Sequence, residues 1–204
     1  MRSGPQVIGP VPAGVDPEEY DRARRRVLWS MPQGLYVVGS RAGGERNLMT
    51  CNWVMQVATD PKLVAVGLDA TSVTARLVRL GGGFAVSLVD RADRAVVRRF
   101  VKPVTEVVLD GAGRVVAMAG VPVTELASGR AILRRHAGWL DCEVRNRVAL
   151  GSHDLVVGEI VAVGEAGGAA DAGGAADAGG AADAGGAGIE GVLRMEDTRM
   201  SYGG

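Results

Sequence analysis

The chain has 204 residues, a length that suits one domain with one hydrophobic core. Its 23 basic residues balance its 23 acidic ones, so the composition lacks the electrostatic signature of a DNA- or RNA-binding protein. The two cysteines, Cys51 and Cys142, exclude a disulfide framework, and no apolar run reaches the ~18 residues of a membrane span. Since the N-terminus lacks a signal-peptide apolar core, we expect a cytoplasmic protein.

The N-terminal part predicts an arm followed by a helix. Residues 1–15 are rich in glycine and proline and favour a flexible arm before a single domain over residues 16–204. Asp16 can cap a helix that has Pro17 in its first turn. The apolar residues of this helix recur at spacings of three and four, which places them on one face: Tyr20, Ala23 and Val27.

Strands are predicted over residues 34–40, from residue 47 onward and over residues 62–68, as a consecutive antiparallel start to a barrel. Asp60-Pro61 forms a corner between two of them, because proline lacks an N–H and holds the preceding residue extended. The run 63–68 is apolar on both faces, which is typical of a strand buried on both sides.

The stretch that begins at residue 47 carries more polar groups than a buried strand normally does. Asn47, Thr50 and Asn52 precede Trp53 directly in this stretch. Because buried donors and acceptors need partners, we expect these residues to contact a flat ligand with a polar edge.

A short helix is expected before Gly81, which can supply the left-handed residue at its C-terminal end. Thr71 or Ser72 can cap its start, and hydroxyl-rich helix N-termini can bind anions. Arg76 lies one turn further on and could add a charge-assisted bond to a phosphate. The alternative is an ordinary helix cap with no ligand. The apolar face of this helix comprises Val73, Leu77 and Leu80.

Another strand is predicted over residues 84–88, followed by a helix over residues 91–100 that Asp90 can cap. The inward-facing residues of this helix are Ala92, Ala95, Val96 and Phe100. Three further extended segments have weak boundaries: residues 105–109, 115–118 and 130–133.

Residues 139–148 show the clearest alternation in the chain and predict a half-buried strand that pairs with residues 154–163. Leu140, Cys142 and Val144 are expected to face the core, which makes Cys142 a core thiol rather than a nucleophile. The opposite face is expected to carry Asp141, Glu143 and Arg145.

Beyond this strand pair the composition changes abruptly. Ala-Gly-Gly-Ala-Ala-Asp repeats from residue 166, and we interpret residues 164–188 as a flexible low-complexity insert that reconnects two strands. Residues 192–195 are expected to form the last strand, followed by a tail.

The sequence contains no G-x-G-x-x-G after a strand, no Walker loop and no nucleophile elbow. His136 and His153 lack cysteine or carboxylate neighbours at metal-ligand spacing, so we expect no metal site. A cofactor that carries the chemistry in its own ring would need no such catalytic constellation.

An ordered series of segments resembles the flavin reductase-like family, whose members bind flavin mononucleotide (FMN) on a split β-barrel. The resemblance covers about residues 20–163. Where the family often has Ala-Ser, Asn and Gly-Asp-His, this chain has Cys51-Asn52, Ser87 and Gly151-Ser152-His153. The matching segments are residues 47–53, 57–61, 63–66, 72–74, 83–86, 98–100, 151–153 and 157–159.

The resemblance implies a mainly β, antiparallel split barrel with a few short helices, which reduces FMN, or FAD, with NADH or NADPH. It also implies a homodimer and a role as the reductase of a two-component monooxygenase. His153 would lie near the nicotinamide or the flavin. The implied flavin-binding residues are Asn47, Met49, Thr50, Cys51, Asn52, Trp53, Gln56, Ser72, Thr74, Arg76 and Phe100.

Alternatives remain open for the residues and for the function. Phe100 and Trp53 could be core residues, Gln56 a solvent-facing strand residue, and His153 a turn histidine bonded to local backbone. The protein could instead be an FMN-binding electron carrier without a nicotinamide site. It could also be a split-barrel protein that uses a deazaflavin, or a non-enzymatic module whose apolar strands build a dimer.

Overall fold

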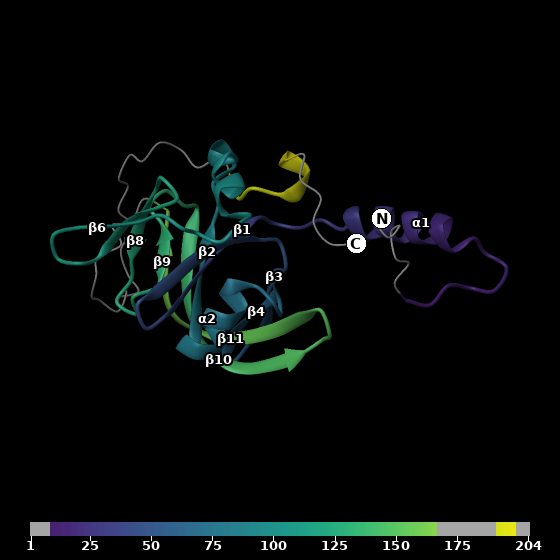
Figure 1. The fold of residues 1–204 in the computed structure, drawn as a ribbon, viewed down its shortest axis with the longest axis horizontal. Coiled ribbons are helices and arrows are strands. Elements are labelled where there is room, and N and C mark those ends of the chain that lie inside the picture. Colours follow the sequence, from purple (N-terminus) through teal and green to yellow (C-terminus); the bar gives the residue numbers. More distant parts are fainter. Residues whose placement is uncertain (1–8, 167–190, 199–204) are drawn as a thin grey trace.

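The computed structural model describes residues 9–166 and 191–198, which form a mainly β fold with few helices (Figure 1). The strands are β1 (Tyr36–Ala42), β2 (Glu45–Cys51), β3 (Val54–Thr59), β4 (Lys62–Asp69), β5 (Gly83–Leu88), β6 (Val107–Leu109), β7 (Val115–Met118), β8 (Val121–Glu125), β9 (Ala131–Leu133), β10 (Gly138–Ala149) and β11 (His153–Glu165). The α-helices are α1 (Pro17–Trp29) and α2 (Val73–Gly81), and the 3-10 helices are η1 (Arg91–Asp93), η2 (Val96–Phe100) and η3 (Met195–Asp197).

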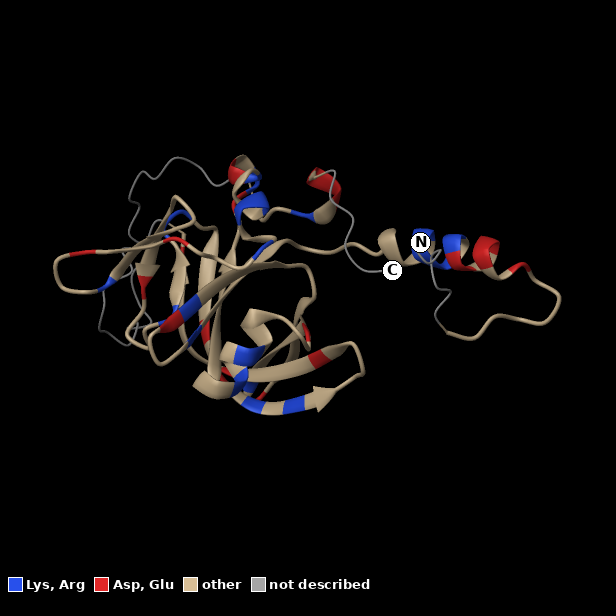
Figure 2. Ribbon diagram, viewed as in Figure 1, with Lys and Arg blue, Asp and Glu red and all other residues tan. Residues whose placement is uncertain are grey.

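The strands form two antiparallel sheets. One has seven strands in the order β2-β1-β5-β10-β11-β4-β3, and the other has four in the order β6-β7-β8-β9. Strand β8 was not expected from the sequence, whereas the mainly β antiparallel architecture is confirmed. Lys, Arg, Asp and Glu are interspersed along the chain (Figure 2).

The predicted consecutive start of the barrel is wrong, because β2 and β4 are not neighbours. Strands β1 and β2 form the expected hairpin, with Ser40 opposite Asn47. The chain then breaks at Asn52 and Trp53, crosses to the other edge of the sheet and forms the β3–β4 hairpin there. The Asp60-Pro61 corner is confirmed as the turn of this second hairpin, since Thr59 pairs with Lys62.

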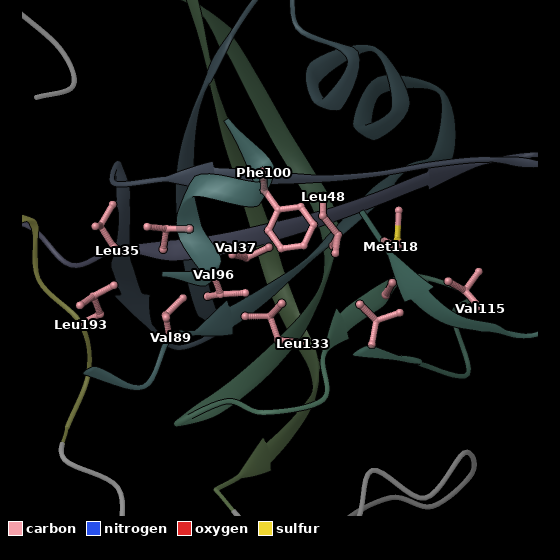
Figure 3. Packing of buried hydrophobic residues seen from close by; sticks show 13 residues of the cluster. Leu35, Val37, Leu48, Val89, Val96, Phe100, Val115, Met118, Leu133 and Leu193 are labelled. Atoms are coloured by element: carbon pink, nitrogen blue, oxygen red, sulfur yellow. The ribbon is translucent and has the colours of Figure 1, made fainter. Parts of the chain in front are cut away.

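Two main apolar clusters stabilise the fold. The first joins the β1–β2 hairpin to η2 and to the smaller sheet, and Figure 3 shows Phe100 of η2 among Leu48, Val37 and Leu133. The second cluster contains Val64, Val66 and Leu68 of β4 together with residues of α2, β5 and β10. The expectation that β4 is buried on both faces is thus largely confirmed.

Helix α1 begins as predicted, but its predicted apolar face is not buried. The Asp16 side chain accepts a hydrogen bond from the Glu19 N–H at 2.8 Å. Val27 is nevertheless 67% exposed, because α1 extends away from the strands (Figure 1). The buried residue of the helix is instead Asp21, which pairs with Arg25 at 2.8 Å.

Helix α2 is confirmed, with two corrections at its C-terminal end. Ser72 caps it by accepting a hydrogen bond from the Ala75 N–H at 3.1 Å. The left-handed residue is Gly82, with φ 71°, rather than Gly81. Leu77 is buried as predicted, whereas Leu80 is 69% exposed, and Ala75 and Val78 complete the buried face with Leu77.

The helix expected over residues 91–100 is wrong. Two short 3-10 helices occupy this segment, and Asp90 caps the first by accepting from the Ala92 N–H at 3.0 Å. Ala92 and Ala95 are exposed, whereas Val96 and Phe100 are buried. Side chains three residues apart eclipse in a 3-10 helix, so Val97 and Phe100 share a buried face, and Val96 is buried beside them.

The long β10–β11 pair is confirmed, and Cys142 is fully buried as predicted. Asp141 does not face solvent, which corrects the expected alternation. It is buried, and Arg130 donates to it and to the Cys142 carbonyl, the latter at 3.1 Å. A register shift between Asp141 and Cys142 interrupts the two-residue period.

The segment near residue 192 forms isolated bridges, Gly34 with Arg194 and Asp90 with Val192, in place of the expected last strand. Strand β11 runs to Glu165, so the first residues of the predicted insert belong to a strand. From residue 167 onward the insert lies outside the described residues, as do residues 1–8 of the predicted arm and the end of the tail.

Candidate functional site

A cleft of about 620 Å³ opens where the chain crosses from β2 to β3. Its walls come from the end of α1, the approach to β1, the 52–55 segment, β4 and the start of β11. The lining is mostly apolar, with a few convergent polar side chains, which is the usual character of a small-molecule site. The lining residues are Leu28, Met31, Pro32, Gln33, Gly34, Tyr36, Asn52, Trp53, Val54, Met55, Ala65, Gly67, Leu150, His153, Asp154 and Leu155.

An aromatic pair forms one wall of this cleft. The rings of Trp53 and His153 lie 4.7 Å apart between centroids, with a 60° angle between their planes. Gly67 on β4 allows this arrangement, because a Cβ there would lie 3.0 Å from the indole ring. The Gly67 N–H also donates to the Trp53 carbonyl at 2.9 Å, so both the ring and the backbone of Trp53 are held against β4. Trp53 remains 38% exposed, which leaves part of the indole available to a ligand.

A pair of amides links two other walls. The Asn52 side-chain nitrogen donates to the Gln33 side-chain oxygen. Each amide has further hydrogen-bonding capacity beyond this contact. Such groups beside an indole can recognise the polar edge of a flat ring.

Asp154 provides a buried negative charge on the cleft wall. Arg147 donates to it through two nitrogens, at 2.8 and 3.1 Å, and Arg79 lies 3.7 Å away. The hydrogen bond from Arg147 lowers the pKa of Asp154, so the carboxylate stays ionised. The neighbouring His153 contacts the Ser152 hydroxyl through Nδ1 at 2.9 Å.

Cys51 and Cys142 are excluded as nucleophiles by their surroundings. Burial raises the pKa of each thiol to about 12. The Cys51 Sγ lies 3.6 Å from the Gly67 carbonyl behind the cleft wall. Burial, and then the neighbouring Cys51, also raise the pKa of Tyr36, so its hydroxyl stays protonated and able to donate.

The structure brings together in one cleft three of the site residues that the family resemblance implies: Asn52, Trp53 and His153. Gln56 is exposed and donates to the Ala58 carbonyl at 3.1 Å, which fits its solvent-facing alternative. Met49 is half-buried and packs on the second core cluster. Neither Gln56 nor Met49 belongs to the residues that line the cleft.

The expectation that Asn47 and Thr50 meet a ligand through their side chains is wrong, because the protein satisfies both. Asn47 donates to Thr74 Oγ1 at 2.9 Å and accepts from the Val104 N–H at 2.9 Å. Thr50 donates to the Val97 carbonyl at 2.5 Å. Phe100 is fully buried in the core, so it cannot cover a flavin; its core alternative is correct.

The residues predicted to bind a phosphate, Ser72, Thr74 and Arg76, do not line the cleft. Thr74 is fully buried, and Arg76 pairs with Glu45 at 2.6 Å. Ser72 is half-buried and caps α2. These contacts do not decide whether Ser72 and Arg76 bind a phosphate, so that role stays a prediction.

The cleft residues missed by the sequence analysis lie at the end of α1 and just after it, and in the turn before β11. Gln33, Tyr36 and Leu150 belong to this group. For the members that follow α1 the sequence signal is a nearby run of apolar residues, which gives no indication that this segment meets Trp53. Among the described residues we find neither a group of side chains suited to a metal ion nor a helix fit to cross a membrane.

Comparison with known proteins identifies the family. The model of the flavin reductase like domain matches residues 28–180. The chain belongs to this family. Its fold is the split barrel expected from the resemblance. A solved structure with a similar fold is the styrene monooxygenase flavin reductase of Pseudomonas putida S12. It has a TM-score of 0.57 and 24% identity, over 70% of this chain and 86% of that one.

Two sequence relatives come from Streptomyces. The NADH-dependent FMN reductase AsuE2 of Streptomyces nodosus subsp. asukaensis is 28% identical over 136 residues, which cover 67% of this chain and 70% of the relative. The NADH:riboflavin 5'-phosphate oxidoreductase of Streptomyces pristinaespiralis is 31% identical over 117 residues, 57% of this chain and 61% of the relative. Further relatives include four diflavin flavoproteins, of whose length the chain spans only 22–24%.

Proposed function

We propose that this protein is an NAD(P)H-dependent flavin reductase that binds FMN, or FAD, in the cleft beside Trp53. The observation that carries the proposal is a partly exposed indole in a mostly apolar cleft, in a chain of the flavin reductase family. The two Streptomyces relatives, which are named as an NADH-dependent FMN reductase and an NADH:riboflavin 5'-phosphate oxidoreductase, support the proposal.

The cleft has the size and chemistry that a flavin ring needs. Its volume of about 620 Å³ falls within the usual range of small-molecule sites. Trp53 offers an aromatic wall, and the Gln33–Asn52 pair offers donors and acceptors to the ring edge. A bound flavin would supply the acceptor for the hydride of the nicotinamide, so the chain needs no acid–base pair of its own.

The residues of the chain then bind and orient. Gly67 and the Trp53 backbone fix the aromatic wall, and the Asp154–Arg147 pair makes the start of β11 rigid. His153 lies against the indole, where its ring can position the nicotinamide. Met31, Met55 and Leu150 form an apolar rim that excludes water from the cleft.

The test is a titration of purified protein with FMN, followed by oxidation of NADH or NADPH in excess FMN. Binding with turnover is the expected result. Binding without turnover would replace the reductase by an electron carrier without a nicotinamide site. Absence of FMN binding would contradict the proposal, and the deazaflavin alternative would then be tested by the same titration.

We also propose a homodimer whose interface lies beside the cleft. Val27, Trp29 and Met31 at the end of α1 are 67%, 49% and 56% exposed, and Met55 and Leu150 on the cleft rim are 63% and 60% exposed. A second copy would remove these exposed apolar side chains from water. Light scattering should give the mass of a dimer, and the double variant Val27→Asp with Trp29→Asp should give a monomer. A monomeric wild type would contradict the idea.

The electron acceptor follows from the same proposal. A reductase of this kind can supply reduced flavin to a monooxygenase partner, which the likeness to the styrene monooxygenase reductase suggests only by fold. The cytoplasmic location stays a prediction.

A further inference from the structure

A second cleft, of about 650 Å³, adjoins the flavin cleft. The two share Pro32, Gln33, Gly34 and Tyr36 as lining residues, so they form one continuous groove. Gly34 lies at the junction, and a Cβ there would displace the Tyr36 side chain. One end of the groove carries the Trp53–His153 pair, and the other end lies between η1 and the segment 191–194.

The far end of the groove is cationic. Among its described lining residues the charged ones are Arg91 and Arg194, which are 39% and 60% exposed at their side chains. Arg91 donates to Asp197 through its Nε at 2.9 Å, and this contact leaves its two terminal nitrogens for a ligand. Arg194 makes a longer contact, 3.3 Å, to Glu196. Neither carboxylate partner lines the groove.

Backbone pairing places both arginines. The Arg91 N–H donates to the Gly191 carbonyl at 2.9 Å, and Leu35 donates to the Leu193 carbonyl at 2.8 Å. The bridge between Gly34 and Arg194 adds a further link to the approach to β1. Figure 2 shows the basic residues of the 3-10 segment and of the C-terminal segment on the same side of the molecule. The fold therefore fixes the backbone positions of both arginines.

We propose that Arg91 and Arg194 bind the phosphate of a nucleotide whose ring occupies the Trp53 end of the groove. The inference rests on the proposed function. Guanidinium groups bind phosphate through paired, charge-assisted hydrogen bonds. The residues at α2 that the sequence predicted as a phosphate site are less suited to bind one, since Thr74 is buried and Arg76 is paired with Glu45. The phosphate has two sources, the flavin itself or the pyrophosphate of the nicotinamide cosubstrate.

The experiment compares ligands with and without phosphate. In the double variant Arg91→Gln with Arg194→Gln, flavin binding is measured for FMN and for riboflavin. KM is measured for NADH and for reduced nicotinamide riboside. If the flavin phosphate is bound here, the preference for FMN over riboflavin falls about tenfold or more. If the cosubstrate pyrophosphate is bound here, the preference for NADH falls instead by a similar factor.

Two controls separate binding from folding and from net charge. Arg98→Gln with Arg99→Gln removes the same charge from exposed positions on η2 and should change neither preference. Asp197→Asn breaks the ion pair of Arg91 but keeps both cations, so it should retain or increase phosphate binding. An equal loss in Asp197→Asn would mean a purely structural role and would overturn the proposal.

Other outcomes also decide whether Arg91 and Arg194 bind a phosphate. Unchanged preferences for both ligand pairs in the double variant, with riboflavin still bound, would overturn the phosphate site and leave the flavin reductase proposal intact. If the wild type binds neither FMN nor riboflavin, the proposed function fails on its own. Calorimetry with inorganic pyrophosphate then tests the arginines: weaker binding in the double variant supports the site, and equal or no binding in both proteins overturns it.

Discussion

Residues 47–51 and residues 52–55 are consecutive in the sequence, but they end in opposite environments. In the packed half, residues 47–51, Asn47 and Thr50 bond to Thr74, to the Val104 N–H and to the Val97 carbonyl. In the open half, residues 52–55, Asn52 and Trp53 line the cleft. Polar residues in a strand therefore indicate a ligand site only where the fold leaves them without enough hydrogen-bond partners in the protein.

The largest effect on stability is expected at Phe100, which is buried in the core as the packed half is. Phe100→Ala should lower the free energy of unfolding by about 3–5 kcal/mol, because the side chain is fully buried in the first core cluster. Urea unfolding measures this loss. FMN affinity, measured at a temperature where the variant is folded, should stay within about twofold; a selective loss of affinity would return Phe100 to the site.

Asn47→Ala should lower the free energy of unfolding by about 2–4 kcal/mol, because it leaves the Thr74 hydroxyl and the Val104 N–H without their partner. The matched variant Asn52→Ala, in the open half, should lose less than about 1 kcal/mol of stability but should weaken FMN binding. Urea unfolding and FMN titration of both variants test the contrast. Equal stability losses would remove the distinction between the two halves.

Asp154→Asn should lower Tm at neutral pH, since it removes the charge that Arg147 binds. Arg147 lowers the pKa of Asp154 below its unfolded value of about 3.9. The stabilisation is therefore complete above that value and is lost as pH falls through the folded pKa. The Tm difference between variant and wild type should accordingly shrink below about pH 4.

Thermal unfolding at several pH values measures this dependence. Glu143→Gln, an exposed acid on the same strand pair, is the control and should show little difference from wild type at any of these pH values. A Tm difference for Asp154→Asn that stays constant down to acid pH would indicate that its charge is unimportant.

The smallest effect on stability, under about 1 kcal/mol, is expected for Trp53→Leu, because the indole is 38% exposed. FMN affinity should nevertheless fall about tenfold, by analogy with the ~1–3 kcal/mol lost when an aromatic stacked on a base is removed. Fluorescence titration with FMN measures it. Trp139→Leu, on β10 outside the flavin cleft, should leave FMN affinity unchanged. Unchanged affinity in Trp53→Leu would move the flavin site away from this cleft.

Local signals in the sequence were sufficient for the elements whose causes are local. Asp16, Ser72 and Asp90 cap where they were expected to, because a cap needs only its own next few residues. The β1–β2 hairpin and the Asp60-Pro61 turn follow from short-range turn chemistry in the same way. The position of β4 could not be predicted like this, since pairing with β11 joins residues about ninety positions apart.

Residue order and composition were sufficient to indicate a mainly β chain of the flavin reductase type, with Asn52, Trp53 and His153 as candidates for one site. The three-dimensional arrangement was needed to place Asn47 and Phe100 in the core, to pair the buried Asp141 with Arg130, and to bring Gln33 and Tyr36 to the cleft. The physical reason is that burial and hydrogen-bond partners depend on residues far away in the chain. Residue type and spacing reveal which groups need a partner, but the fold determines whether that partner is protein or ligand.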